Sequence, residues 1–116
     1  MLPVLVVDDH PSFRASARAV LEADGFQVIG EAADGTSALR QCLQLCPDLV
    51  LLDVQLPDMT GFDVCAELRS RGAAPDVVLV SSRDASDYGE LVEASGALGF
   101  VSKAELCGDT VSALLP

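Results

Sequence analysis

The sequence predicts an α/β domain in which five βα units surround a parallel sheet. Apolar runs of strand length alternate along the chain with stretches that carry apolar residues at the helical period. The chain has 116 residues, so we expect residues 1–116 to form one domain around a single core. Polar residues directly follow several apolar runs, as they do where parallel strands end at a ligand crevice.

The five expected strands are short apolar or mixed segments. They span about 3–8, 26–31, 48–53, 76–81 and 98–102. The segments that begin at residues 3, 48 and 76 are continuous apolar runs, which is typical of central strands covered on both faces. The second segment is more mixed, so we expect it at an edge of the sheet.

The expected helices fill the stretches between these strands. Three of them show buried stripes at i, i+3, i+4 and i+7 spacing. The stripes are Phe13, Ala17, Val20 and Leu21; Leu39, Cys42, Leu43 and Cys46; and Tyr88, Leu91 and Val92. Val64, Cys65 and Leu68 predict a further helix at about 61–70, and a short last helix is expected at about 105–114.

Composition narrows the class of protein. The formal net charge is −11, from 18 acidic and 7 basic residues, so we expect the domain to repel phosphate backbones and not to bind nucleic acid itself. No apolar run approaches the roughly 20 residues of a membrane span, and no signal-peptide pattern is present, so we expect a cytoplasmic protein without a membrane partner. The four cysteines lack C-x-x-C spacing and three occupy apolar helix positions, which favours structural thiols over a metal site or disulfides.

Five polar residues stand where apolar runs end: Asp8, Asp9, Asp53, Ser81 and Lys103. The crevice of an open parallel sheet lies beyond the carboxyl ends of its strands, so we expect these side chains to converge. Neighbouring carboxylates repel and need a cation, and Mg²⁺ combines a few carboxylates with waters and phosphate oxygens. The five residues therefore predict a Mg²⁺-assisted phosphate site.

Each of these residues also has a simpler interpretation. Alone, Asp8 and Asp9 could form a solvated turn or a helix cap, Ser81 an ordinary strand-end hydroxyl, and Lys103 a solvated cation; their joint placement favours the site. Asp53 could be a third metal ligand or a nucleophile that forms an aspartyl phosphate. Lys103 and the Ser81 hydroxyl could neutralise or hydrogen-bond phosphoryl oxygens.

Elsewhere the simpler interpretation is preferred. We expect His10 to face solvent at the start of the first helix, without a catalytic or ligand role. Gly89, Gly96 and Gly99 do not open a helix after a strand, so a nucleotide-binding loop is not expected.

Four segments, in this order, resemble the receiver domain of bacterial two-component response regulators. They are Asp8-Asp9, residues 52–61 (LDVQLPDMTG), Val80-Ser81-Ser82 and residues 100–103 (FVSK). The resemblance covers the whole chain and implies a doubly wound, flavodoxin-like (CheY-like) fold with strand order 2-1-3-4-5.

The same resemblance implies roles for particular residues. Asp53 would be the phosphoacceptor, and Mg²⁺ would be held by Asp8, Asp9, Asp53 and the backbone carbonyl of Gln55. Ser81 and Phe100 would be the switch residues, and Lys103 the partner of the phosphoryl group.

Residues 8–14 (DDHPSFR), the absence of a proline after Lys103 and a short last helix are most similar to the NarL/FixJ subfamily. Receivers of that subfamily are usually joined to a C-terminal helix-turn-helix domain. We therefore expect a receiver excised from a longer regulator.

The expected function is a phosphorylation-dependent switch that controls an output such as transcription. A histidine kinase or phosphotransfer protein would supply the phosphoryl group, and the domain would catalyse only its own phosphorylation and dephosphorylation. Output, and a possible homodimer, would use the face built from helix four, strand five and helix five, about residues 86–115. Gln55 and Arg83, each two residues past a site residue, should flank the path of water to the phosphoryl group and so tune its lifetime.

Two alternatives come from other classes of protein. A haloacid-dehalogenase-type phosphatase also uses an aspartyl phosphate, but it requires D-x-D after a strand, and Asp53-Val54-Gln55 lacks the second acid. The other alternative is a receiver-like interaction module that is never phosphorylated. The full set of acidic residues together with Lys103 argues against it.

Overall fold

The computed structural model describes residues 2–72 and 75–116. In these residues five parallel strands form one sheet in the order β2-β1-β3-β4-β5. The strands are β1 (Pro3–Val7), β2 (Gln27–Ala32), β3 (Leu49–Asp53), β4 (Asp76–Ser81) and β5 (Gly99–Ser102). The predicted fold class and strand order are confirmed, and the second strand lies at an edge as expected.

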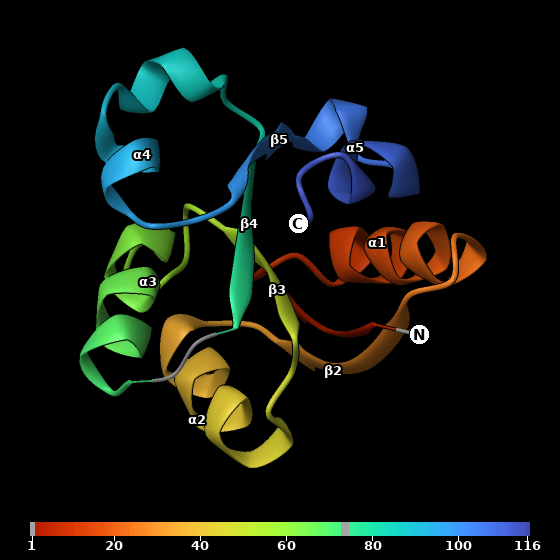
Figure 1. The fold of residues 1–116 in the computed structure, drawn as a ribbon, viewed down its shortest axis with the longest axis horizontal. Helices are drawn as coiled ribbons and strands as arrows, with labels where there is room; N and C mark the ends of the chain where they lie inside the picture. The colour runs from red at the N-terminus through yellow and green to blue at the C-terminus, as the bar shows by residue number, and fades with distance from the viewer. Residues whose placement is uncertain (1, 73–74) are drawn as a thin grey trace.

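Helices cover both faces of this sheet (Figure 1). They are α1 (Pro11–Ala23), α2 (Gly35–Leu45), α3 (Gly61–Ser70), α4 (Leu91–Ala94) and α5 (Gly108–Ser112), with 3₁₀ turns η1 (Ala85–Tyr88) and η2 (Lys103–Glu105). Helices α1 and α5 lie on one face, and α2, α3 and α4 lie on the other. No helix in the described part of the chain has the length and apolar character needed to cross a membrane.

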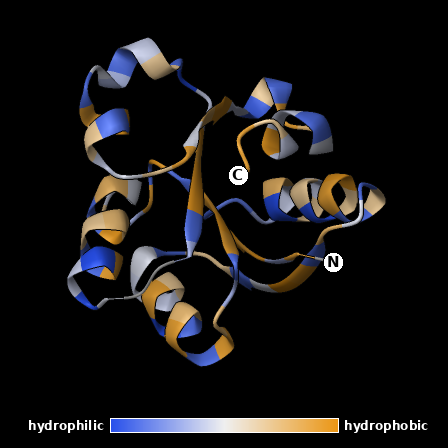
Figure 2. Cartoon of the chain, viewed as in Figure 1, coloured by the Kyte–Doolittle hydropathy of each residue, from blue (hydrophilic) through white to orange (hydrophobic). Residues whose placement is uncertain are grey.

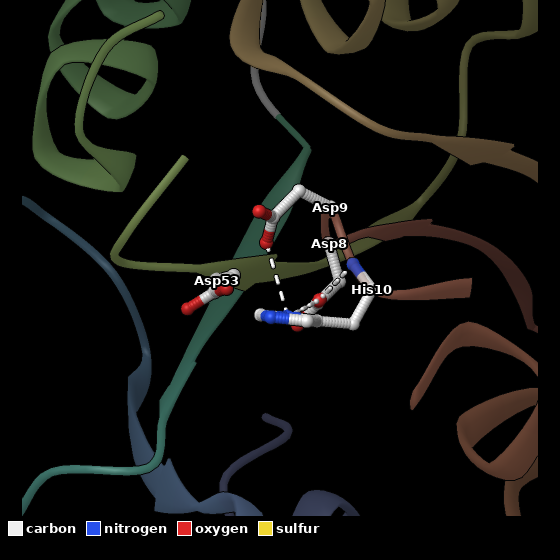
Figure 3. A group of neighbouring side chains, drawn as sticks. All are labelled: Asp8, Asp9, His10 and Asp53. Carbon is white, nitrogen blue, oxygen red and sulfur yellow. Dashed lines mark hydrogen bonds and ion pairs between the residues drawn. The ribbon is translucent and has the colours of Figure 1, made fainter. Parts of the chain in front are cut away.

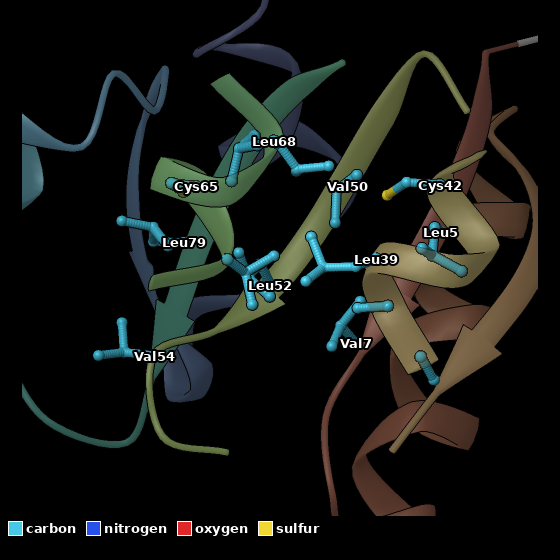
Figure 4. Packing of buried hydrophobic residues seen from close by; sticks show 14 residues of the cluster. Leu5, Val7, Leu39, Cys42, Val50, Leu52, Val54, Cys65, Leu68 and Leu79 are labelled. Atoms are coloured by element: carbon cyan, nitrogen blue, oxygen red, sulfur yellow. The ribbon is translucent and has the colours of Figure 1, made fainter. Parts of the chain in front are cut away.

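The central strand β3 shows why the sheet is buried on both sides. All five of its residues are buried, and successive side chains point to opposite faces. Val50 and Leu52 join the cluster under α2 and α3 (Figure 4), whereas Leu49 and Leu51 join the cluster under α1 and α5. Apolar residues accordingly gather on the strands and the inward sides of the helices (Figure 2). The apolar core thus leaves the carboxyl ends of the strands as the place for polar groups.

The fourth and fifth helices are shorter than the sequence pattern predicted. The stripe Tyr88, Leu91 and Val92 predicted one helix, but Gly89 adopts φ 57° and ψ −128°, a conformation that breaks the helix. Tyr88 therefore ends a 3₁₀ turn, and Leu91 is 53% exposed. The last helix, expected at about 105–114, is confined to α5 because residues 103–105 form a 3₁₀ turn.

Two members of the stripe predicted for the second helix are not buried. Leu43 is 76% exposed, and Cys46 lies beyond the helix end in the left-handed conformation (φ 49°). Assigning Cys46 to the core was therefore wrong. Cys42 and Cys65 are buried, and burial raises the pKa of both thiols to about 11, which keeps them protonated at neutral pH.

Candidate functional site

An acidic cluster lies at the carboxyl ends of β1 and β3. These strands are paired as far as Val7 and Leu52, so Asp8 and Asp53, the next residues, are neighbours. The Asp8 N–H still donates to Ala32 of β2 (3.0 Å), which holds its carboxylate at the sheet. One oxygen from each of Asp8, Asp9 and Asp53 and one ring nitrogen of His10 lie within 4.8 Å of one another (Figure 3). Asp8 and Asp53 are buried, whereas Asp9 is exposed.

Lys103 joins this cluster from η2, directly after β5. Its Nζ lies 2.5 Å from Asp8 Oδ2 and 3.3 Å from Asp53 Oδ2. The ammonium also lies 4.5 Å from the ring centroid of Phe13 on α1, a cation–π contact. Lys103 is the only lysine in the chain, and its side chain is only 16% exposed. One ammonium therefore neutralises part of the charge on two buried carboxylates.

Burial and charge shift the ionisation of these three groups. Burial raises the pKa of Asp53 to about 6, opposed by the Gln55 N–H (3.1 Å) and assisted by the charge of Asp8. Burial also acts to raise the pKa of Asp8, but Lys103 and the His10 backbone N–H outweigh it and hold that pKa below its usual value. For Lys103, burial acts to lower the pKa, and the two carboxylates more than reverse this effect. The ion pair is thus charged at neutral pH.

The charges and donor atoms fit a divalent cation. With all four groups ionised, three carboxylates and one ammonium leave two negative charges unbalanced. The buried oxygen Asp8 Oδ2 forms an ion pair with the Lys103 ammonium, but it accepts no hydrogen bond from the residues that the structure describes. Carboxylate oxygens are the ligands that Mg²⁺ prefers.

His10 lies closer to the cluster than the sequence suggested. Its side chain is 65% exposed, but its Nδ1 lies 3.0 Å from Asp8 Oδ1 and 3.1 Å from Asp9 Oδ1 (Figure 3). The His10 backbone N–H donates to Asp8 Oδ1 (2.8 Å), an Asx-type turn that folds the imidazole back over the carboxylates. The expectation that His10 is exposed at the start of the first helix is confirmed, but its contacts with Asp8 and Asp9 were not predicted. The Asp-x-His spacing was the signal for this turn.

Ser81 is the last residue of β4, beside Asp53, because Val80 pairs with Asp53. Its buried hydroxyl lies 2.7 Å from the Tyr88 hydroxyl and accepts the Arg83 N–H at 3.1 Å. The Tyr88 ring contacts Phe100 and Phe62, with centroid distances of 5.9 Å and 5.6 Å. Sequence reasoning gave Tyr88 only a core position, because the pattern of apolar residues carries no information on where its hydroxyl points.

The loop after Asp53 closes on itself. Gln55 and Thr60 form an isolated antiparallel bridge, and the Gly61 N–H donates to Val54 (2.8 Å). A Cβ on Gly61 would lie 2.6 Å from the Asp53 carbonyl oxygen, so only glycine allows this close return. The Gln55 side chain points outward and is exposed, as is that of Arg83.

Asp58, in the same loop, attaches it to helix α2. The carboxylate accepts hydrogen bonds from Gly35 N (2.8 Å), Thr36 N (3.0 Å) and the Thr36 hydroxyl (2.8 Å). These hydrogen bonds at the helix N-terminus lower the pKa of Asp58 to about 2. Sequence analysis did not assign this function to Asp58.

Comparison with known proteins identifies the class. Residues 4–114 match the family described as the response regulator receiver domain, and the chain belongs to this family. The resemblance inferred from the sequence is therefore confirmed.

Its relatives include transcription regulators of the NarL/LuxR type. The chain is 36% identical over 110 residues to BvgA of Bordetella pertussis, named as a transcription regulator of virulence factors, covering 95% of this chain and 53% of BvgA. It is 33% identical over 110 residues to the DNA-binding transcriptional activator EvgA of Escherichia coli, covering 95% of this chain and 54% of EvgA. The chain thus spans about half the length of these relatives.

Solved structures agree in fold. The NarL signal receiver domain from Mycobacterium tuberculosis is 34% identical, with a TM-score of 0.86 over 97% of this chain and 95% of that one. A LuxR-family two-component response regulator from Aurantimonas is 28% identical, with a TM-score of 0.87 over 98% and 85% of the two chains.

Proposed function

We propose that this receiver domain accepts a phosphoryl group on Asp53 from the phosphohistidine of a kinase or phosphotransfer protein. The observation that carries this proposal is the position of Asp53 at the end of the central strand, with the Asp8 carboxylate and the Lys103 ammonium beside it. The transfer would require Mg²⁺. The resulting switch would control transcription, the activity named for BvgA and EvgA.

The proposed reaction uses the Asp53 carboxylate as nucleophile. A carboxylate oxygen attacks phosphorus while the P–N bond of the phosphohistidine breaks, and the bonding electrons return to the imidazole nitrogen. In the dephosphorylation step water attacks phosphorus, the bond between phosphorus and Asp53 breaks, and inorganic phosphate leaves. The Lys103 ammonium, 3.3 Å from Asp53 Oδ2, can neutralise charge on the transferred group.

Asp8, Asp9, Asp53 and the Gln55 carbonyl would hold the cation in this proposal. When bound, Mg²⁺ supplies positive charge to the phosphoryl oxygens. Asp8 and Asp53 are buried and fixed by strand pairing, whereas Asp9 is exposed and can adjust. The oxygen-rich donor set supports Mg²⁺ as the ion.

The test of the function is phosphorylation of the domain itself. Incubation with acetyl phosphate and Mg²⁺ should add one phosphoryl group, detected by intact mass and located at Asp53 by peptide mass spectrometry. Asp53→Asn should abolish the modification, and Asp109→Asn, which changes an exposed acid on α5, should not. If Asp53→Asn were modified to the wild-type level, Asp53 would not be the acceptor.

A second prediction concerns the metal. Asp9→Ala should weaken Mg²⁺ binding about tenfold or more, because it removes one of only three carboxylate ligands. Binding can be measured in the absence of any phosphoryl donor, from the rise in unfolding temperature with MgCl₂ concentration.

The neighbouring variant His10→Ala is the control, since it removes an exposed ring from the cluster and leaves all three carboxylates. Its Mg²⁺ affinity should remain close to that of the wild type. A Mg²⁺ response of Asp9→Ala equal to that of the wild type would refute the role of Asp9.

We also propose how the domain is used. One of its transcription-regulator relatives is named as DNA-binding, which supports a parent protein that would carry a DNA-binding domain beside this one. The parent protein would act in the cytoplasm. The face of α4, β5 and α5 would transmit the state of Asp53 through Ser81 and Phe100, and could pair two receivers. The exposed side chains of Gln55 and Arg83 would set the lifetime of the phosphoryl group.

A further inference from the structure

In the segment between β4 and α4, residues 82–90, one side chain is partly buried and the others are exposed. Every residue from Ser82 to Asp87 is exposed, as are Gly89 and Glu90. Tyr88 alone is partly buried, with its ring against Phe62 and Phe100. The position of this segment therefore depends on what holds Tyr88.

The Tyr88 hydroxyl is joined to the Ser81 hydroxyl at 2.7 Å. A serine hydroxyl has one proton to donate and two lone pairs to accept. One lone pair of Ser81 already accepts the Arg83 N–H at 3.1 Å. Either hydroxyl can be the donor at this distance. With Ser81 as the donor, its single proton goes to Tyr88 and cannot at the same time go to a phosphoryl oxygen.

We infer that Tyr88 is a positioning residue that competes with the phosphoryl group of Asp53 for the Ser81 hydroxyl. This inference rests on the proposed function, in which the Ser81 hydroxyl turns to the phosphoryl oxygens. When Ser81 makes that bond, the Tyr88 hydroxyl loses its partner, and Tyr88 is held by its aromatic contacts with Phe62 and Phe100. Gly89, at φ 57° and ψ −128°, provides a pivot between Tyr88 and α4.

The first test uses the unphosphorylated domain, so it does not depend on the proposed function. Tyr88→Phe keeps the ring and removes only the hydroxyl. Amide hydrogen exchange of residues 83–90 should become about three- to tenfold faster, the range expected for one net hydrogen bond. Ser81→Ala should give at least the same increase, because it also removes the acceptor of the Arg83 N–H. The double variant should show no more than Ser81→Ala alone, because both lack the bond between Ser81 and Tyr88.

The matched control is Phe62→Leu, which loosens the ring packing and leaves the hydroxyl pair intact. Its effect on exchange should add to that of Ser81→Ala. Additive effects of Tyr88→Phe and Ser81→Ala would overturn the inference, as would unchanged exchange in Tyr88→Phe.

The second test uses acetyl phosphate and Mg²⁺. Phosphorylation should accelerate amide exchange of residues 83–90 in the wild type. It should accelerate exchange little in Tyr88→Phe, where the hydrogen bond between Tyr88 and Ser81 is already absent. An equal acceleration in both proteins would contradict the competition. Failure of the wild type to be phosphorylated would instead refute the proposed function and with it the competition, while the non-additivity measured above would still decide whether Tyr88 holds Ser81.

Discussion

Replacing Lys103 by methionine should lower the free energy of unfolding by about 3 kcal/mol at pH 7 in the metal-free domain, because it leaves two buried carboxylates without their ammonium. Asp8 is fully buried and Asp53 is 2% exposed, so water cannot take over this role. Methionine keeps most of the aliphatic stem, which limits the loss of packing against Phe13. Urea unfolding followed by circular dichroism, without divalent ions, measures the change.

The loss of stability in Lys103→Met should depend on pH. Lys103 holds the pKa of Asp8 below its ordinary value, so the stability that it contributes is present at neutral pH. That stability is lost as the pH falls through the native pKa of Asp8, and the gap between variant and wild type should close in acid. In an Asp8→Asn background the same replacement should cost much less. A loss of equal size in that background, or one independent of pH, would contradict the assignment.

Asp53→Asn should have the opposite effect and stabilise the metal-free domain by about 3 kcal/mol at pH 7.5. Burial and the charge of Asp8 raise the pKa of Asp53 from 3.8 to about 6. Between these values the native state binds more protons than the unfolded state, so stability falls as the pH rises from about 4 to about 6 and stays lower above. Asparagine removes this penalty and still offers an oxygen to the Gln55 N–H.

Thermal unfolding across pH 4–8 measures the difference. The gain of Asp53→Asn should be largest above pH 6 and should nearly vanish at pH 4. It should also shrink as MgCl₂ is added, since the cation stabilises the wild type more. The exposed Asp109→Asn is the control and should change stability by less than about 0.5 kcal/mol. If Asp53→Asn had the same unfolding temperature as the wild type at pH 7.5, ionised Asp53 would not destabilise the domain as predicted.

The fold could be predicted because its determinants are repeated along the chain. The continuous apolar runs of β1, β3 and β4 identify central strands, and parallel strands present their last residues at one edge. That topology explains why Asp8, Asp53 and Lys103, far apart in sequence, lie together in the structure.

What the sequence did not reveal depends on single backbone angles and on hydroxyl directions. Periodicity could not detect that Gly89 would interrupt the fourth helix, because the apolar spacing continues past it. Nor could it indicate that the Tyr88 hydroxyl would meet Ser81 or that His10 would fold back over Asp8. These contacts arise from turns of two to four residues, in which one rotation redirects a side chain.

The closed loop between Asp53 and Gly61 affects the entropy of ligand binding. Its ends are already joined by the bond from Gly61 to Val54 and by the bridge between Gln55 and Thr60, while Asp58 fixes its middle to α2. The conformational freedom of these residues is therefore lost when the domain folds rather than when an ion or phosphoryl group arrives. A ligand that uses the Gln55 carbonyl meets a preorganised segment, so most of its binding free energy remains available for affinity.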